Sequence, residues 1–285
     1  MPEPLAVDCL IVGAGPAGLT AATYLARFRR RIALVDAGAS RARWIPTSHN
    51  CPGFPLGVSG PGLLQRLREQ AEAHDVAITR GRIDALQRES GGFVARDAQG
   101  GRWRAASVIL ATGIVDRLPE VEGGAAALEK AIDAGVLRLC AVCDAYEATD
   151  ERIAVLGAAD EASRHARFLR TFSRSVDAIA LESVAGLRCD ASRCTVAFGD
   201  GSARDYDTLY PVLGSDAQSQ LARGLGAAVD EAGALRTDAH LQTSVDGLYA
   251  IGDVVSALNQ IAVAVGHAAI AATAVHNRLP PNPRE

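Results

Sequence analysis

A glycine-rich turn near the N-terminus constrains the fold more than any other part of the chain. An apolar stretch, Val7–Val12, runs into the loop Gly13–Gly18, which reads G-A-G-P-A-G. A helical pattern follows from Leu19 to Phe28, and a second apolar stretch, Ile32–Val35, ends on Asp36. Strand, glycine turn, helix, strand and acidic residue in this order are the fingerprint of a dinucleotide-binding βαβ unit.

The three glycines of this loop have different roles. In order, Gly13, Gly15 and Gly18 allow a tight turn, a close approach of a pyrophosphate to the backbone, and packing of the helix on the strand. The helix N-terminus then meets the phosphates, and Asp36, 21 residues after Gly15, can accept a hydrogen bond from a ribose hydroxyl. A chance glycine turn is the alternative, and the surrounding strand, helix and acidic residue disfavour it.

A cysteine pair indicates redox chemistry. Cys140 and Cys143 are spaced C-x-x-C, with Asp144 directly behind them. Thiols one helical turn apart can close and reopen a disulfide, so the pair can hold two electrons. Half of a zinc site is the alternative, and Cys189 with Cys194 could supply another half site. No second C-x-x-C or histidine pair completes either one, so we expect no metal.

The composition is that of an ordinary globular enzyme. The chain has 285 residues, of which 48% are hydrophobic and 22% charged, enough for two domains with separate cores. A net charge of -4 and scattered arginines argue against a nucleic-acid partner. We see no signal peptide, and the apolar stretch Ile261–Val275 is short and interrupted, so we expect no membrane span and a cytoplasmic protein.

The pattern predicts an α/β fold with two Rossmann-like domains of the three-layer ββα type, the second inserted into the first. The expected segments are 1–115 and 241–285 for the dinucleotide-binding domain and 116–240 for the inserted redox domain, with a linker near 114–120. Further expected elements are a Pro/Gly-rich loop at Trp44–Gly62, a helix to Ala73, strands at Val76–Thr79, Gly92–Arg96, Trp103–Ala106, Ser107–Ala111, Ile153–Leu156 and Val176–Leu181, a helix to Thr171, a strand from Leu248 that ends on Asp253, and a helix at Gln260–Asn277.

Five motifs together resemble those of low-molecular-weight thioredoxin reductases. They are the N-terminal glycine loop, Asn50–Gly53 (NCPG), Ala111–Gly113 (ATG), Cys140-x-x-Cys143-Asp144, and Gly252-Asp253 with Asn259-Gln260. The motifs follow one another in the family's order over nearly the whole chain. The resemblance implies an FAD domain made by the first and last segments, an inserted domain with the dithiol and a NADPH site, and a homodimer.

The resemblance also implies the residues that bind FAD. Asp253 would bond the ribityl chain or the pyrophosphate, and residues 260–262 would face the isoalloxazine ring. The full expected set is Gly13, Gly15, Pro16, Ala17, Gly18, Asp36, Ala37, Asn50, Ala111, Thr112, Gly113, Gly252, Asp253, Asn259, Gln260, Ile261 and Ala262.

By the same resemblance, Cys143 would face the flavin and Cys140 would attack the disulfide of a partner, either a protein such as thioredoxin or a small molecule that cycles as a dithiol. Asp144 would give and take the proton of the departing thiolate, directly or through water. The chemistry is sound on its own terms, because a thiolate must form to attack and a nearby acid must return protons as the disulfide opens. His49, in the loop placed near the flavin, could relay a proton, although a loop histidine is more often solvated or capping.

The inserted domain departs from the family pattern. A nicotinamide site needs a second glycine after Leu156, and Ala159 stands there, where its methyl group pushes a pyrophosphate away from the backbone. Glu182 ends the next strand, where a NADPH enzyme normally offers arginines to the 2′-phosphate. Residues 182–200 hold little beyond one expected short strand, so this domain looks trimmed.

We therefore predict a branch that works without NADPH and receives its electrons from ferredoxin or a second flavin. Three alternatives stay open. One is an NAD(P)H-dependent thioredoxin-disulfide reductase, because Glu182 suits the 2′-hydroxyl of NADH. Another is a dithiol oxidase that gives its electrons to oxygen, and the last is a flavin-binding sensor with no turnover.

Overall fold

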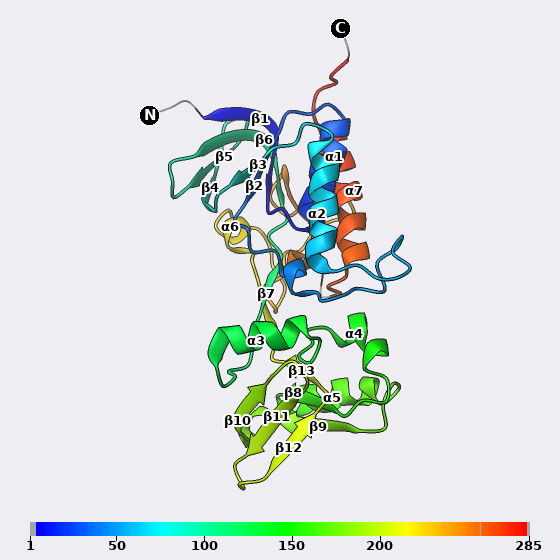
Figure 1. The fold of residues 1–285 in the computed structure, drawn as a ribbon. Helices are drawn as coiled ribbons and strands as arrows, with labels where there is room; N and C mark the ends of the chain where they lie inside the picture. Colours follow the sequence, from blue (N-terminus) through cyan, green and yellow to red (C-terminus); the bar gives the residue numbers. More distant parts are fainter. Residues whose placement is uncertain (1–3, 257, 284–285) are drawn as a thin grey trace. The chain divides into compact units, whose positions relative to one another are not determined.

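A computed structural model describes residues 4–256 and 258–283 and confirms the α/β fold. The chain divides into two units (Figure 1). Unit 1 comprises Met1–Arg43, Pro61–Val115 and Asp216–Glu285, and unit 2 comprises Trp44–Gly60 and Asp116–Ser215. The short strands β7 (Ile114–Asp116) and β14 (Ser215–Ala217) pair where the chain passes between the units.

The sheet of unit 1 is parallel at its centre and antiparallel at one end. Its main path runs β3-β2-β1-β6-β5-β4, and β15 pairs with the second half of β6, where β5 has already ended. Strands β3, β2, β1, β6 and β15 are mutually parallel. The strands are β1 (Leu5–Val12), β2 (Ile32–Asp36), β3 (Ile78–Arg80), β4 (Ile83–Glu89), β5 (Gly92–Asp97), β6 (Arg102–Leu110) and β15 (Leu248–Ala250).

Strand β1 is buried on both faces, as a central parallel strand must be. Leu10 and Val12 join the apolar cluster of the antiparallel strands, whereas Cys9 and Ile11, on the opposite face, are also fully buried. Helices lie beside the parallel strands in Figure 1, and α1 packs directly on α7. The helical elements of this unit are α1 (Pro16–Arg27), α2 (Gly60–Glu72), α6 (Gln220–Arg223), α7 (Ile261–Arg278), and the 3₁₀ turns η1 (Arg41–Trp44) and η4 (Gly252–Val254).

Unit 2 has three layers, as predicted. Its parallel sheet runs β13-β8-β9. In β8, Ile153 and Val155 face the cluster that contains α5, and Ala154 and Leu156 face the cluster of an antiparallel sheet. The elements are α3 (Gly124–Asp133), α4 (Ala141–Asp144), η2 (Tyr146–Ala148), β8 (Ile153–Gly157), α5 (Ala159–Leu169), β9 (Val176–Ala180), η3 (Leu181–Ser183), β10 (Val184–Cys189), β11 (Cys194–Phe198), β12 (Ala203–Tyr206) and β13 (Thr208–Val212).

The unit boundaries differ from the expected segments at two places. Residues 216–240, expected in the inserted domain, belong to unit 1, because Ala222, Ala227 and Leu235 are buried in its core. Residues 44–60, expected with the N-terminal segment, belong to unit 2, where Trp44 packs against the core.

Three local expectations are also corrected. The two strands expected at 103–111 are one strand, β6, because it pairs with β1 along its length. Strand β4 was missed, since its residues alternate too weakly to show a buried face. The expectation that residues 182–200 are trimmed is wrong, since β10 and β11 pair there and β12 completes an antiparallel sheet.

A disulfide joins Cys189 to Cys194 across this sheet. The two residues are directly opposed in β10 and β11, with their Cα atoms 4.1 Å apart, and both are buried in the core of unit 2. The turn between them is closed by Asp190, whose Oδ1 accepts bonds from Ser192 and Arg193 backbone N–H groups. The disulfide excludes the half metal site, and no metal-binding cluster occurs among the residues that the structure describes.

We expect this disulfide to be structural. Closing so short a loop should stabilise the fold by about 2 kcal/mol through the entropy of the unfolded chain. The double variant Cys189→Ala/Cys194→Ala should therefore lose at least that much free energy of unfolding in urea titrations. Thiol counting on the denatured, unreduced wild-type protein should find only Cys9 and Cys51 free. An unchanged free energy of unfolding, or labelling of Cys189 and Cys194 when the modified cysteines are identified by peptide mass spectrometry, would contradict this assignment.

Candidate functional site

The parallel strands of unit 1 bring the predicted binding residues to one edge of the sheet. Gly13 follows β1, Asp36 ends β2, Ala111 follows β6 and Gly252 follows β15. Because these strands are parallel, their carboxyl ends share one edge. Ligands of open α/β sheets bind at this edge.

The geometry of the glycine loop fits a dinucleotide. Gly13 has φ +103°, and a Cβ there would lie 2.4 Å from the Ala111 carbonyl oxygen. A Cβ on Gly18 would lie 1.8 Å from the Gly13 carbonyl oxygen, so helix α1 can reach β1 only through glycine. At Gly15 a Cβ would meet only the Ser40 Oγ, at 3.2 Å. The backbone at Gly15 is thus open to a ligand, while its two companion glycines are packing positions.

Asp36 holds this loop in shape. One carboxylate oxygen accepts from the Ala14 N–H at 2.9 Å and the other from the Gly38 N–H at 3.0 Å. Ala37 lies between Asp36 and Gly38 in the turn after β2. The carboxylate is therefore fixed at the strand end, where a ribose hydroxyl of a bound dinucleotide could reach its remaining lone pairs.

The turn after β6, at the same edge of the sheet, has a hydrogen-bond partner that the sequence did not reveal. The Thr112 hydroxyl donates to the Gln218 carbonyl oxygen at 2.6 Å, and the Gln218 N–H donates to the Gly113 carbonyl oxygen at 2.9 Å. These bonds fix the turn after β6. Gln218 follows the return strand β14, and no sequence motif marks it.

His267 fixes the turn after β15. The Gly252 N–H donates to its Nδ1 at 3.3 Å, and burial lowers the pKa of His267, which favours the neutral ring that accepts this bond. Gly252 has φ +73°, so the turn that presents Asp253 depends on glycine. The sequence placed His267 on an alanine-rich helix, with helix packing or solvent as its expected environment, and an isolated helical histidine has no pattern that marks this bond.

The start of α7 carries an unsatisfied polar atom. The Asn259 Oδ1 is buried and has no hydrogen-bond partner among the described residues. Gln260 is the N-cap of α7, and Ile261 and Ala262 form its first turn. A buried carbonyl without a donor is costly, and a donor group on a bound cofactor would remove that cost. The open glycine loop and this oxygen together fit the predicted cofactor.

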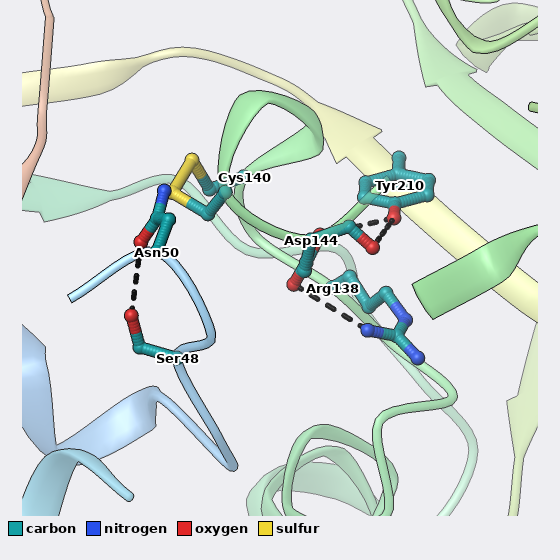
Figure 2. The surroundings of a disulfide bond; sticks show 7 residues. Ser48, Asn50, Arg138, Cys140, Asp144 and Tyr210 are labelled. Carbon is teal, nitrogen blue, oxygen red and sulfur yellow. Dashed lines mark hydrogen bonds and ion pairs between the residues drawn. A yellow bond between two sulfur atoms is a disulfide. The ribbon is translucent and has the colours of Figure 1, made fainter. Parts of the chain in front are cut away.

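In unit 2, Cys140 and Cys143 form a disulfide, with Cα atoms 5.2 Å apart (Figure 2). Cys140 is the N-cap of the short helix α4, and the Cys143 N–H donates to the Cys140 carbonyl oxygen at 2.9 Å. Val142 is 60% exposed and Tyr146 is 77% exposed, so apolar side chains around the disulfide face solvent. A partner can therefore reach this segment of the chain.

Asp144 lies behind the disulfide in a largely buried site. Its Oδ1 accepts from the Tyr210 hydroxyl at 3.0 Å, and its Oδ2 is 3.7 Å from the Arg138 Nη1 (Figure 2). Burial raises the pKa of Asp144 to about 6, although Arg138 and the Tyr210 hydroxyl both lower it. Near neutral pH such a carboxyl can both hold and release a proton, as a general acid and base must.

Loop 44–60 belongs to unit 2 and carries His49 and Asn50, two residues that were expected near the flavin. Figure 2 shows the Asn50 side chain beside the disulfide, and the Ser48 hydroxyl donates to the Asn50 Oδ1 at 3.0 Å. The His49 Nδ1 lies 2.9 Å from the Glu147 Oε1, in the turn that follows α4. His49 thus ties this loop to the dithiol segment, and Asn50, expected to bind the cofactor, lies in the unit that carries the dithiol.

The second glycine loop carries alanines and is followed by acidic residues. Ala158 is the N-cap of α5 and Ala159 its first residue, and Asp160 and Glu161 lie in its first turn. Both carboxylates lie at the N-terminal end of α5, the end of a helix that favours a phosphate, and Glu161 is paired with Arg164. Glu182 is exposed in the turn η3 directly after β9.

Comparisons with known proteins agree with this geometry. The family described as pyridine nucleotide-disulphide oxidoreductase matches residues 7–186 and 172–268. The chain is 31% identical to a thioredoxin reductase of Mycolicibacterium smegmatis, over 87% of this chain and 88% of that protein. It is 28% identical to the thioredoxin reductase of Peptoclostridium acidaminophilum, over 93% of this chain and 95% of that one. The crystal structure of thioredoxin reductase from Streptococcus pyogenes superposes with a TM-score of 0.86 at 27% identity, covering 96% of this chain and 98% of that one.

The raised pKa of Asp144 predicts a pH-dependent cost to stability. The folded carboxyl, with a pKa of about 6, binds its proton more tightly than the unfolded one at 3.8. Asp144 therefore favours folding at low pH, and this contribution is lost as the pH rises through about 6. Asp144→Asn should gain stability over the wild type between pH 4 and pH 8, by about 2 to 3 kcal/mol. Tyr210→Phe removes a bond to the carboxylate and should raise the pKa further.

Urea unfolding at a series of pH values measures this difference. Asp133→Asn, at the exposed end of α3, is the matched control and should show a flat difference. A flat difference for Asp144→Asn as well would contradict the buried, proton-holding carboxyl.

Proposed function

The chain belongs to the pyridine nucleotide-disulphide oxidoreductase family, and from this premise we propose that it passes two electrons between FAD and the Cys140–Cys143 pair without NADPH. It is a flavin disulfide oxidoreductase of the thioredoxin reductase type. The pair then exchanges with a disulfide partner, such as thioredoxin or a small disulfide. The observation that carries the proposal is the Cys140–Cys143 disulfide with a buried carboxyl behind it.

The FAD residues come from unit 1. The open backbone at Gly15, the carboxylate of Asp36 and the start of α7 with the orphaned Asn259 oxygen support a dinucleotide there. When bound, FAD supplies or accepts an electron pair and so couples the disulfide to a second redox partner. The contacts that residues 111–113, 252–253 and 260–262 are expected to make with FAD are part of this proposal.

Asp144 donates and accepts the protons of the disulfide exchange. Two electrons and one proton convert the Cys140–Cys143 disulfide into one thiol and one thiolate. Cys140, as thiolate, attacks the partner disulfide and releases a partner thiolate, which takes the proton of the Asp144 carboxyl. Cys143 then loses its proton to Asp144 and attacks the mixed disulfide at Cys140, so that the original disulfide re-forms and the partner leaves reduced. A carboxyl with a pKa near 6 can serve both proton transfers.

Three features of unit 2 support an electron donor other than NADPH. Ala159 replaces the second glycine of the nucleotide loop, Asp160 and Glu161 occupy the first turn of α5, and Glu182 follows β9. Ferredoxin or a second flavin is the donor we propose. The strongest rival is an NADH-dependent reductase, because Glu182 can accept from a ribose 2′-hydroxyl but repels a 2′-phosphate. A dithiol oxidase would use the same residues, with electrons flowing in the opposite direction, from the dithiol through the flavin to oxygen.

A homodimer remains a prediction. None of the helices among the described residues is long and apolar enough to cross a bilayer.

Rapid mixing with nicotinamide cofactors tests the donor. The oxidised, FAD-loaded protein should keep its yellow colour after anaerobic mixing with excess NADPH or NADH. Rapid bleaching by NADH alone would establish the rival reductase, and bleaching by NADPH would overturn the proposal. Oxygen uptake on addition of a dithiol distinguishes the oxidase.

Placing the family's residues at positions 159 and 182 should allow NADPH to act as the electron donor. Ala159→Gly/Glu182→Arg removes the blocking methyl group and adds a bidentate phosphate ligand, so NADPH should reduce the flavin at least about tenfold faster than in the wild type. Ala158→Gly, one residue earlier, is the matched control and should change nothing. Equal rates in all three proteins would show that these positions do not determine donor choice.

A further inference from the structure

We propose that the Asn50 side-chain amide donates a hydrogen bond to the thiolate formed when the Cys140–Cys143 disulfide opens, with Ser48 holding the amide in the donating orientation. This inference rests on the proposed disulfide exchange and assigns Asn50 a role in it. The role differs from the flavin contact that the sequence predicted for this residue.

The orientation of the amide comes first. The Ser48 hydroxyl donates to the Asn50 Oδ1 at 3.0 Å, so the oxygen end of the amide is engaged on the side away from the sulfur atoms. Figure 2 shows the nitrogen end directed at the disulfide. An amide nitrogen carries two donor hydrogens and no acceptor, so this end suits an anion.

The two residues directly before Asn50 are both anchored. Ser48 is buried, and its backbone N–H and carbonyl pair with Val58, on the far side of the loop, at 2.8 and 3.0 Å. The His49 Nδ1 lies 2.9 Å from the Oε1 of Glu147, which lies in η2, just after α4. The amide is therefore held to the same segment of unit 2 that carries the sulfurs, which is the condition for a preorganised donor.

A hydrogen bond from the Asn50 amide stabilises the oxidised disulfide little and the reduced pair much more, because only the reduced pair carries a negative charge. When a reductant supplies two electrons, the S–S bond breaks, one sulfur takes a proton and the other keeps a negative charge. Hydrogen bonds to charged acceptors are about twice as strong as neutral ones. Asn50 therefore acts on the reduced state and favours the thiolate that attacks.

Other groups around the pair carry charge and set the background against which Asn50 acts. Negative charge near the thiolate opposes its formation and positive charge favours it. The titratable and charged groups in the segments around the pair include His49, Cys51, Arg138, Asp144, Tyr146, Glu147 and Tyr210. An amide has no charge of its own, so its effect stays constant while these groups titrate.

A thiolate titration tests the proposal. The full-length protein is reduced with dithiothreitol, freed of it without air, and titrated by the ultraviolet absorbance of the thiolate and by the rate of alkylation, with peptide mass spectrometry to identify the cysteine. Asn50→Ala should raise the midpoint of thiolate formation by about one pH unit. Asn50→Asp, of the same size, should raise it further, and Ser48→Ala should raise it less. Leu56→Ala, 90% exposed in the same loop, is the matched control and should leave it unchanged.

The outcomes separate this inference from the proposed function. An unchanged midpoint in Asn50→Ala and Asn50→Asp, with circular dichroism like that of the wild type, overturns the inference, and a loss of bound flavin alone would return Asn50 to the role of a cofactor ligand. The titration needs no electron donor and no turnover. A shifted midpoint in a protein whose flavin never exchanges electrons with the pair would therefore keep the donor role and reject the exchange.

Discussion

The close approach of helix α1 to strand β1 is the contact on which the cofactor cradle depends. A Cβ at Gly18 would lie 1.8 Å from the carbonyl oxygen of Gly13, and one at Gly13 would lie 2.4 Å from that of Ala111. Glycine at these positions lets the helix begin directly at the carboxyl end of the strand. The same edge then receives the turns after β2, β6 and β15, so the loop, Asp36 and residues 252–253 become neighbours through topology.

A different constraint governs unit 2. Its chemistry needs a carboxyl that stays close to a disulfide and exchanges protons near neutral pH. The fold supplies it by burying Asp144 against Tyr210 of β13 and then limiting the resulting shift with Arg138. The cost falls on stability above pH 6, which is the usual exchange of stability for function at a reactive site.

Much of the fold followed from the sequence because its signals are local. The strand, glycine turn, helix and acidic residue of 7–36 each carry their own pattern, and C-x-x-C-D needs no context to suggest a dithiol. The missed features depend on contacts far along the chain. Gln218 and His267 become visible only when their strands and helix return to the sheet edge, and the Cys189–Cys194 pair only when β10 and β11 align. Loop 44–60 was placed with the wrong unit for the same reason, because Trp44 carries no signal of the core that it joins.

If electrons pass between a bound flavin and the Cys140–Cys143 pair, a dithiol should reduce the flavin through that pair. The measurement is an anaerobic titration of the purified, FAD-loaded protein with dithiothreitol, with Cys140→Ser/Cys143→Ser as the comparison. The wild-type flavin should bleach at low dithiothreitol while the flavin of the double variant stays yellow. Equal bleaching of both proteins, or a polypeptide that binds no flavin on reconstitution, would contradict it.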